Sequence, residues 1–529
     1  MAAAPTAPGE ERNRMEAKSA PRPPAGPPGE PAGQLHRTAL GVSDIVFFIV
    51  AASAPLTVVA GGVAATYLVT GNAGVPLLFL VLGAILALFV VGYAAMSHYI
   101  TNAGAFYAYV ARGIGKIPGV GTAFVALIAY NSMQIGIAGL FGAVFSGFML
   151  DKTGIDLDWW AWIFIAIAVI GVLGWLRVDL NAKVLAIFLT LEIIVLIVFD
   201  IVVVGDPAPA GISLDAFNPD IAFGAALGAA LSFTMAAFVG FESAAIYGEE
   251  CKDPRRTVAR ATFIALGITS LFYAFSAWML ASAVGSDVIT NPGALVEGGY
   301  TTPDGAAPDP TSVLFITLDT QISSTVADIA TLLFCTSLFA AMLSFHNAVA
   351  RYFYALGRAG VLPAVFSRTR ANGAPFVGSL AQTAIAAIVI AIFALSDSDP
   401  VLQLFTWLTN LGALGVILLL ALASFSVVGY FSRHQHTETT WTTKIAPGLA
   451  GVLLSAVFVI VLSNFNQLIT GLPDAPGDAR SVILPAILLG GGLVGMAVGA
   501  FLRQSRPEVY AGIGEHGEEV GEHPATPVR

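Results

Sequence analysis

The chain has 529 residues, of which 56% are hydrophobic and only 11% are charged. Soluble globular domains carry about 25% charged residues, so a fold surrounded by water could not bury this much apolar surface. The formal net charge is -10, and the sequence has no basic stripe of the kind that binds phosphates, so no nucleic-acid partner is expected. The composition predicts a protein that lies in a lipid bilayer.

Twelve stretches of the sequence are apolar enough to cross the hydrocarbon core, which takes about 20 residues of helix. They lie near residues 41–69, 74–97, 119–150, 159–176, 182–204, 221–248, 258–284, 324–350, 375–396, 401–428, 445–464 and 481–502. Backbone amides in lipid need partners within their own segment, and the strands of a membrane β-barrel would be shorter and alternate in polarity. The sequence therefore predicts an all-α polytopic membrane protein with twelve transmembrane helices.

The remaining segments are predicted to be tails and loops. Residues 1–38 are rich in Ala, Pro and Gly and are expected to form a disordered cytoplasmic tail. Residues 39–504 hold the twelve-helix domain, and residues 505–529 are expected to form a disordered acidic tail. The connection from about 285 to 320 carries acidic residues but no Lys or Arg, which suits an external loop.

The basic residues predict how the chain is oriented, because Lys and Arg stay on the cytoplasmic side of a membrane. With twelve helices and an internal N-terminus, every Lys and Arg falls on that side except Lys152 and Arg480. A miscounted helix would break this alternation partway along the chain. We therefore expect a multi-pass protein of the plasma membrane, the inner cell membrane, with both termini in the cytoplasm.

Two of the twelve stretches contain residues that interrupt a helix. Pro55 in the first stretch lacks an amide proton and clashes with a preceding carbonyl, and Gly240 in the sixth permits local unwinding beside Glu242. Ordinary kinks are the alternative, since Gly and Pro are common in transmembrane helices. Breaks at matching positions five helices apart favour a binding site near the middle of the membrane.

Three further stretches resemble the amino acid, polyamine and organocation (APC) permeases. The match lies in FVGFES (238–243) with EECKDPRR (249–256), in RYFYALGRAGVLP (351–363) and in TNAGAFY (101–107). The resemblance covers residues 41 to about 503. It implies the inverted five-plus-five repeat of the LeuT fold, with broken helices 1 and 6 and with helices 11 and 12 appended.

The resemblance also implies a secondary transporter that carries an amino acid by alternating access, coupled to protons or, as the alternative, to sodium. No other cofactor and no metal site is implied, and the partners are a small solute, the bilayer and, at most, a second copy in a homodimer. In this family, backbone amides bind the substrate carboxylate and backbone carbonyls bind its ammonium group. The residues that this assigns to the substrate are Ala54, Pro55, Leu56, Thr57, Val58, Ala236, Ala237 and Val239, with Phe238, Phe241, Tyr130, Asn131 and Trp407 around the side chain.

The first helix departs from the usual Gly-Ser-Gly of the family, because Pro55, Leu56 and Thr57 stand there. Pro55 removes one amide donor, so a substrate without a carboxylate, such as a polyamine or another organic amine, is the alternative. An exchanger and a substrate sensor built on the same fold stay open as well. An enzyme is not expected, because the sequence contains no catalytic or metal-binding motif.

Two carboxylates in apolar stretches are the candidates for ion coupling. A charge at the bilayer centre costs about 2.5–3.5 kcal/mol on insertion scales, so such residues usually have a function. Glu242 is predicted to gate the site or carry a proton, with a structural hydrogen-bond acceptor as the alternative. By the resemblance, Glu192 stands where some proton-coupled members have a lysine, and Thr336 and Ser337 are its expected hydroxyl partners.

Overall fold

The structure is a computed structural model that describes residues 41–100, 105–175, 181–224, 226–242, 254–301, 309–370, 374–472 and 475–514. All of these belong to one compact unit. The predicted N-terminal tail lies outside the described residues. Within them every regular element is helical and none is a strand, so the all-α prediction is confirmed.

Nine helices of the described chain are long and apolar enough to cross a membrane, by length and composition. They are α4 (Val75–Ser97), α6 (Lys116–Thr153), α8 (Asn181–Gly205), α11 (Pro254–Val284), α15 (Ser324–Arg358), α16 (Phe376–Leu395), η6 (Pro400–Phe405) with α17 (Thr406–Phe431), η7 (Trp441–Ile445) with α18 (Ala446–Ser463), and α20 (Arg480–Ser505). The first, fourth and sixth predicted spans contain shorter apolar helices: η1 (Thr57–Val63) with α3 (Ala64–Thr70), α7 (Trp159–Trp175) and α10 (Leu227–Phe238).

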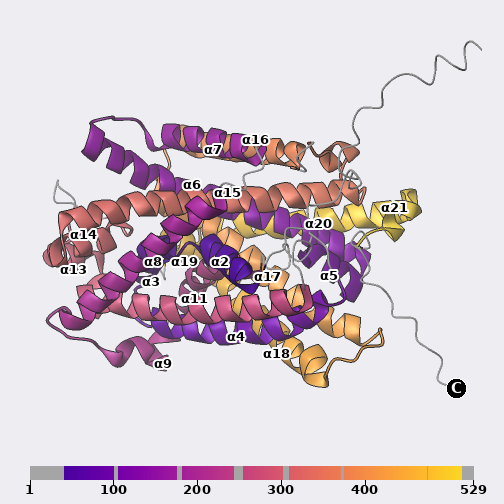
Figure 1. Cartoon of the computed structure of the whole chain (residues 1–529), viewed down its shortest axis with the longest axis horizontal. Helices are drawn as coiled ribbons and strands as arrows, with labels where there is room; N and C mark the ends of the chain where they lie inside the picture. The colour runs from indigo at the N-terminus through magenta and orange to yellow at the C-terminus, as the bar shows by residue number, and fades with distance from the viewer. Residues whose placement is uncertain are drawn as a thin grey trace, which may run out of the picture. The chain divides into compact units, whose positions relative to one another are not determined.

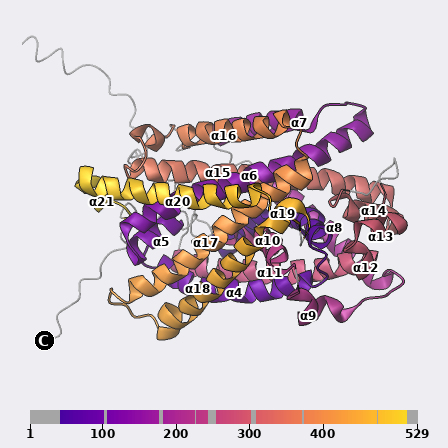
Figure 2. The same ribbon diagram turned by 180° about the vertical axis from the view of Figure 1, so that it is seen from behind.

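Short elements connect the long helices. They are α5 (Ala105–Gly113), η2 (Leu214–Phe217), α9 (Pro219–Ala222), α12 (Ser286–Ile289), α13 (Pro292–Glu297), α14 (Ser312–Gln321), η5 (Ala364–Ser367), α19 (Phe465–Thr470) and α21 (Pro507–Ala511). The helices α5 and α21 lie at one end of the bundle and α13 and α14 at the other (Figures 1 and 2). We call the end with α5 and α21 the basic end, because Arg112, Lys116 and Arg358 lie there.

The first span is broken at the position that the sequence predicts. The helix α2 (Val42–Ser53) ends before Ala54, whose φ is +48°. Pro55 explains the break, because a proline disfavours the α conformation of the residue before it and cannot donate to the helical ladder. The chain then continues in the wider π-helical turns of η1, a geometry that often marks functional sites.

The sixth span is also interrupted where a glycine permits it. The helix α10 ends at Phe238, Val239 is extended with ψ 128°, and Gly240 has a φ of +112°. Residues with a Cβ rarely adopt that φ, so only glycine is comfortable there. The end of this predicted span, residues 243–248, lies outside the described residues.

Close packing of α6 against α17 places two helices beside the breaks. A Cβ on Gly136 would lie 2.8 Å from the backbone nitrogen of Thr409, and one on Gly412 would lie 2.6 Å from Cγ of Met133. Small residues let membrane helices approach this closely. Met133 and Thr409 are thereby held on the inner faces of their helices.

The C-terminal segment differs from the predicted disordered tail of residues 505–529. The helix α21 begins two residues after α20 ends, and the chain behind it is held against α5. The amide of Gly514 donates to Oη of Tyr107 at 3.1 Å, and Nε of Arg112 donates to the carbonyl of Gly514 at 3.1 Å. The apolar side chains of Val509, Tyr510 and Ile513 give this short segment a face to bury.

We expect the anchored C-terminal segment to stabilise the basic end. Ile513 is only 1% exposed, and truncating a buried isoleucine to alanine typically costs about 2–5 kcal/mol. Ile513→Ala should therefore lower the thermal unfolding temperature of the purified protein. Val494→Ala, which truncates a half-exposed side chain on α20, is the control and should leave that temperature nearly unchanged. Equal effects of the two substitutions would contradict the anchoring.

Candidate functional site

A cavity of about 50 Å³ lies between the two helix breaks. It is lined by Ser53, Ala54, Thr57, Val58, Gly62, Met133, Ile137, Phe233, Ala236, Ala237, Val239, Ala341, Phe345, Phe405 and Thr409. These residues come from both sides of the first break, from the end of α10, and from α6, α15, η6 and α17. The volume provides space for a few water-sized groups, so any occupant in this conformation is small.

The wall of the cavity is mostly apolar, and none of its described side chains carries a charge. Its hydroxyls already have partners: Oγ of Ser53 donates to the carbonyl of Val50 at 3.0 Å, and Oγ1 of Thr409 donates to that of Phe405 at 2.7 Å. Helix ends remain as a source of polarity, because they present amides or carbonyls together with a partial charge. A small molecule with one negative and one positive group matches such a site.

Six of the predicted substrate residues line this cavity. They are Ala54, Thr57, Val58, Ala236, Ala237 and Val239. Pro55 instead borders a separate apolar cavity of about 240 Å³ together with Ile193 and Tyr273. Leu56 is fully buried, and its backbone amide lies beside the carboxylate of Glu192. Residues of the first break thus contact two different parts of the structure. Ala54, Thr57 and Val58 line the first cavity, whereas Pro55 borders the second cavity and Leu56 lies beside Glu192.

The aromatic residues assigned to the substrate side chain do not line the cavity. Phe238 packs against Phe79 with ring centroids 5.8 Å apart, and Phe241 against Phe89 at 6.0 Å. Both phenylalanines are almost completely buried. Phe238 stands five residues after Phe233 and so lies on another face of α10, and Phe241 lies beyond the break at Gly240, so only Phe233 reaches the cavity.

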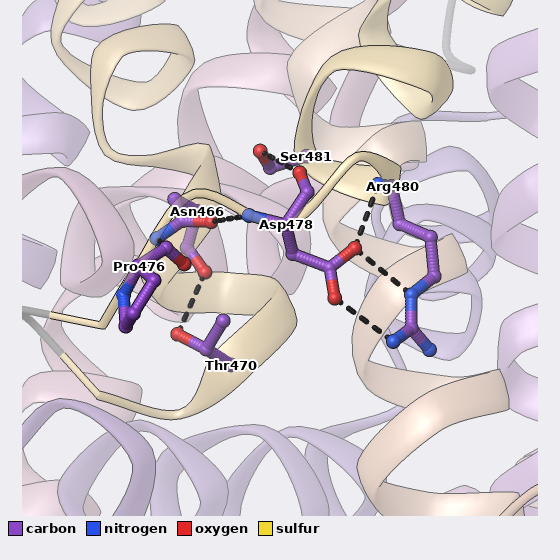
Figure 3. Close-up of polar contacts among 6 residues, drawn as sticks. All are labelled: Asn466, Thr470, Pro476, Asp478, Arg480 and Ser481. Atoms are coloured by element: carbon purple, nitrogen blue, oxygen red, sulfur yellow. Dashed lines mark hydrogen bonds and ion pairs between the residues drawn. The ribbon is translucent and has the colours of Figure 1, made fainter.

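Trp407 is held by a group at the end of the bundle opposite the basic end. The guanidinium of Arg480 lies 4.8 Å from the centre of its ring, and Phe393 packs against its edge. Figure 3 shows Arg480 facing the carboxylate of Asp478, to which Nε and Nη2 donate at 2.9 and 2.8 Å. These bonds hold the pKa of the Asp478 carboxyl below its ordinary value. Trp407 of α17 thus contacts Arg480, which is itself paired with Asp478 in the loop before α20.

Several residues that line the cavity could not be recognised as site residues from the sequence. They are Ser53, Gly62, Met133, Ile137, Phe233, Ala341, Phe345, Phe405 and Thr409. Each is an apolar or small residue within an apolar helix, where the same residue types fill lipid-facing and core positions. The packing of the helices selects the ones that face the cavity, as the contact of α6 with α17 does for Met133 and Thr409.

Glu242 lies outside the cavity, in a buried cluster of tyrosines. One carboxylate oxygen accepts from Oη of Tyr130 at 2.6 Å, and the other accepts from the amide of Gly240 at 2.9 Å. The carbonyl of Glu242 accepts from Oη of Tyr93 at 2.8 Å. The ring of Tyr130 contacts Phe345, which lines the cavity. This cluster therefore closes the cavity toward the basic end.

Glu192 belongs to a second buried cluster, on the other side of the first break. Its carboxylate accepts from Oγ of Ser337 at 2.7 Å, and this hydroxyl in turn accepts from Oγ1 of Thr57 at 3.1 Å. The structure thus brings Glu192 and Ser337 together, and it links them to a residue that lines the cavity. Thr336, the other expected partner, donates to the carbonyl of Leu333 on its own helix.

Asn131 makes a local contact. Its amide donates to the carbonyl of Leu127 one turn earlier, while Oδ1 has no partner among the described residues. It lies next to Tyr130 on α6 but does not line the cavity.

The geometry at Gly240 yields a test of the tyrosine cluster. Gly240→Ala places a Cβ at a φ of +112°, where strain costs about 1–3 kcal/mol, and should displace the amide from Glu242. We expect lower thermal stability and loss of any transport. Gly267→Ala on α11 is the control, because its added Cβ meets nothing within 4 Å. Wild-type behaviour of Gly240→Ala would show that this backbone conformation is dispensable.

Comparison with known proteins identifies the family. Residues 40–490 match the model of the amino acid permease family. The branched-chain amino acid permease BcaP of Lactococcus lactis subsp. cremoris is 26% identical over 383 residues, 67% of this chain and 74% of the relative. The lysine-specific permease LysP of the same organism is 30% identical over 149 residues, 28% of this chain and 27% of the relative. Because the family model spans most of its length, this chain belongs to the amino acid permease family.

Proposed function

We propose that this protein carries an α-amino acid with a small apolar side chain across the plasma membrane, by alternating access and coupled to protons. The observation that supports this most directly is the position of the cavity between two broken helices. The proposal includes the twelve-span topology of the LeuT fold. In it, α2, η1 and α3 form one broken span, α7 another span, and α10 begins the second broken span.

The orientation in this proposal follows from the charges. Arg112, Lys116 and Arg358 lie at the basic end, so the basic end faces the cytoplasm by the positive-inside rule. The described C-terminal segment lies at this end too, beside α5. The opposite end, with α13 and α14, then faces outward.

The broken helices provide the recognition of the substrate. The helical segment after the first break begins at Pro55, and Thr57 lies in its first turn, whose N-terminal end favours a carboxylate. Ala236 and Ala237 end α10, whose carbonyl end favours an ammonium group. A zwitterion satisfies both ends at once, so the site needs no charged side chain.

The apolar wall favours a neutral side chain of modest size. Met133, Ile137 and Phe405 line the cavity, and no acidic side chain does. A lysine side chain or a polyamine would bring a further positive charge into this wall without a counter-charge, which is costly. Among the two relatives, the branched-chain permease therefore offers the better analogy to this site than the lysine permease.

The tyrosine cluster supplies a gate at the basic end. Phe345 and Tyr130 separate the cavity from Glu242, and Tyr93 ties α4 to the interrupted sixth span. Release of substrate toward the basic end requires these contacts to open. Rearrangement of the broken segments against their neighbours is the motion that alternating access implies.

The second cluster supplies the coupling. While Glu192 is ionised, its carboxylate oxygens only accept hydrogen bonds, and Ser337 donates its hydroxyl proton to one of them. Once protonated, Glu192 is also a donor, and its O–H can donate to Oγ of Ser337, the same oxygen that accepts from Thr57. Because Thr57 lines the cavity, protonation changes the substrate site through two hydrogen bonds.

The experiment that tests the proposed substrate is thermal unfolding of the purified protein with a ligand panel. A ligand at 100 times its dissociation constant stabilises the folded state by about 2.7 kcal/mol. We expect alanine and valine to raise the unfolding temperature, and their decarboxylated amines, lysine and putrescine to leave it unchanged. Stabilisation by the amines instead would favour the organic-amine alternative.

The coupling is tested by Glu192→Gln in proteoliposomes. Glutamine keeps an acceptor for Ser337 but cannot take up a proton. We expect this variant to retain exchange of external for internal substrate and to lose accumulation driven by a pH gradient. Asp206→Asn, an exposed change just beyond the same helix, is the control. Accumulation by Glu192→Gln at the wild-type level would remove Glu192 from the coupling.

A further inference from the structure

A second carboxylate lies in the buried stripe of the helix that carries Glu192. The buried residues in the outer part of α8 are Glu192, Leu196, Phe199, Asp200 and Val203. This spacing of three to four residues places them on one face of the helix. Asp200 therefore lies on the same face as Glu192, about 12 Å farther along the axis. It is about 8 Å from the end of α8 at Gly205.

Asp200 is buried with one oxygen unsatisfied. The residue is 3% exposed, and Oδ2 accepts from Oγ of Ser276 on α11 at 2.8 Å. Oδ1 has no hydrogen-bond partner, and no ion pair of the described residues involves Asp200. A buried carboxylate without a counter-charge is expensive, so it favours taking up a cation. A proton is the cation that one carboxyl group with one hydroxyl neighbour can hold.

Hydroxyl groups on α11 continue from Asp200 toward the cavity. Tyr273 stands three residues before Ser276 and so shares its face of the helix. Its Oη donates to Oγ of Ser53 at 2.9 Å, and Ser53 lines the cavity. Tyr273 also lies near Glu192, within electrostatic range of the carboxylate. The interface of α8 and α11 thus carries the hydroxyl groups of Ser276 and Tyr273, beside the apolar cavity that Pro55 borders.

The other carboxylates on the helices packed against α8 are occupied elsewhere. Asp328 of α15 is paired with Nζ of Lys152 at 2.8 Å. Asp44 of α2 accepts from the amide of Gly41 at the start of that helix. On α11, Tyr273 is the titratable side chain beside this interface. Glu192 is thus the described carboxylate that shares the interface with Asp200.

We propose that Asp200 is a second proton-binding group of this transporter, which receives a proton from the end opposite the basic end and passes it to Glu192. This inference rests on the proposed proton coupling. The carboxylate of Asp200 gains the proton through its unsatisfied Oδ1 and becomes a neutral acid. The proton then leaves Asp200 and protonates Glu192, with Tyr273 of α11 as the hydroxyl group beside this part of the interface.

The alternative role for Asp200 is structural, as the acceptor that holds α8 to Ser276. Two variants separate the roles. Asp200→Asn keeps an acceptor oxygen for Ser276 but cannot bind a proton, whereas Ser276→Ala removes the bond and keeps the carboxyl group. Asp200→Glu restores a titratable group and serves as the conservative rescue. Thermal unfolding of each variant establishes that it is folded before transport is measured.

The measurement is substrate uptake by proteoliposomes, with and without an inward pH gradient, beside exchange at equal pH. We expect Asp200→Asn to exchange substrate like wild type, to lose gradient-driven accumulation and to lose the pH dependence of uptake. Ser276→Ala and Asp200→Glu should keep accumulation, and Asp206→Asn should behave like wild type. A folded Asp200→Asn that accumulates substrate with the wild-type pH profile would overturn the proposal, as would a Ser276→Ala that reproduces the defect.

The same assay separates this inference from the proposed function. If the wild-type protein accumulates substrate equally well without a pH gradient, the proton coupling fails and the role of Asp200 fails with it. If wild type requires the gradient and Asp200→Asn still responds to it, only the role of Asp200 is overturned. Glu192→Gln, measured in parallel, shows the defect that a lost coupling group produces.

Discussion

The constraint on which this structure depends is that backbone polar groups inside a bilayer need partners within the protein. Unbroken helices meet this need by themselves, which is why most of the membrane-spanning helices can be predicted from the sequence. The helical geometry is interrupted at Ala54 and at Val239 with Gly240, and at both places the irregular backbone borders the same cavity. Exposed backbone is tolerated in a membrane protein only where it is buried in protein or lines such a cavity. The two breaks and the cavity therefore explain one another.

The same scarcity of water shapes how the buried acids are held. Glu242, Glu192 and Asp200 all accept hydrogen bonds from hydroxyl groups, and no described cation pairs with any of them. A hydroxyl satisfies a carboxylate oxygen yet does not fix its charge as a lysine or arginine would. Such an acid can gain or lose a proton with a modest rearrangement, because serine and tyrosine hydroxyls both donate and accept. Buried acids with hydroxyl partners suit a protein whose charges must change during its cycle.

The fold was largely predictable and the site only partly so, for physical reasons. Apolar stretches of about 20 residues mark spanning helices, and Pro55 and Gly240 mark the breaks, because each acts through its own backbone. The resemblance assigns Phe238 and Phe241 to the substrate side chain, but Phe238 at the end of α10 and Phe241 beyond Gly240 both pack against α4. Met133 and Thr409 can be assigned to the cavity only from the packing of α6 on α17, which depends on residues far apart in the chain. Residues 507–514 of the predicted tail are held in place because a few apolar side chains suffice to anchor them when α5 offers a surface.

The two carboxylate clusters lie on different sides of the cavity, and this separation gives the proposed cycle its logic. Glu242 is joined to Tyr130 of α6 and Tyr93 of α4, so its bonds resist opening toward the basic end. Glu192 is joined through Ser337 to Thr57 in the first broken span, so its protonation acts on the substrate-binding segment. A substrate that bridges Thr57 and the end of α10 would connect the two clusters mechanically, since α10 leads directly to Gly240 and Glu242. An occupied site would then transmit a change at Glu192 to the gate at Glu242, whereas an empty site would leave the clusters independent.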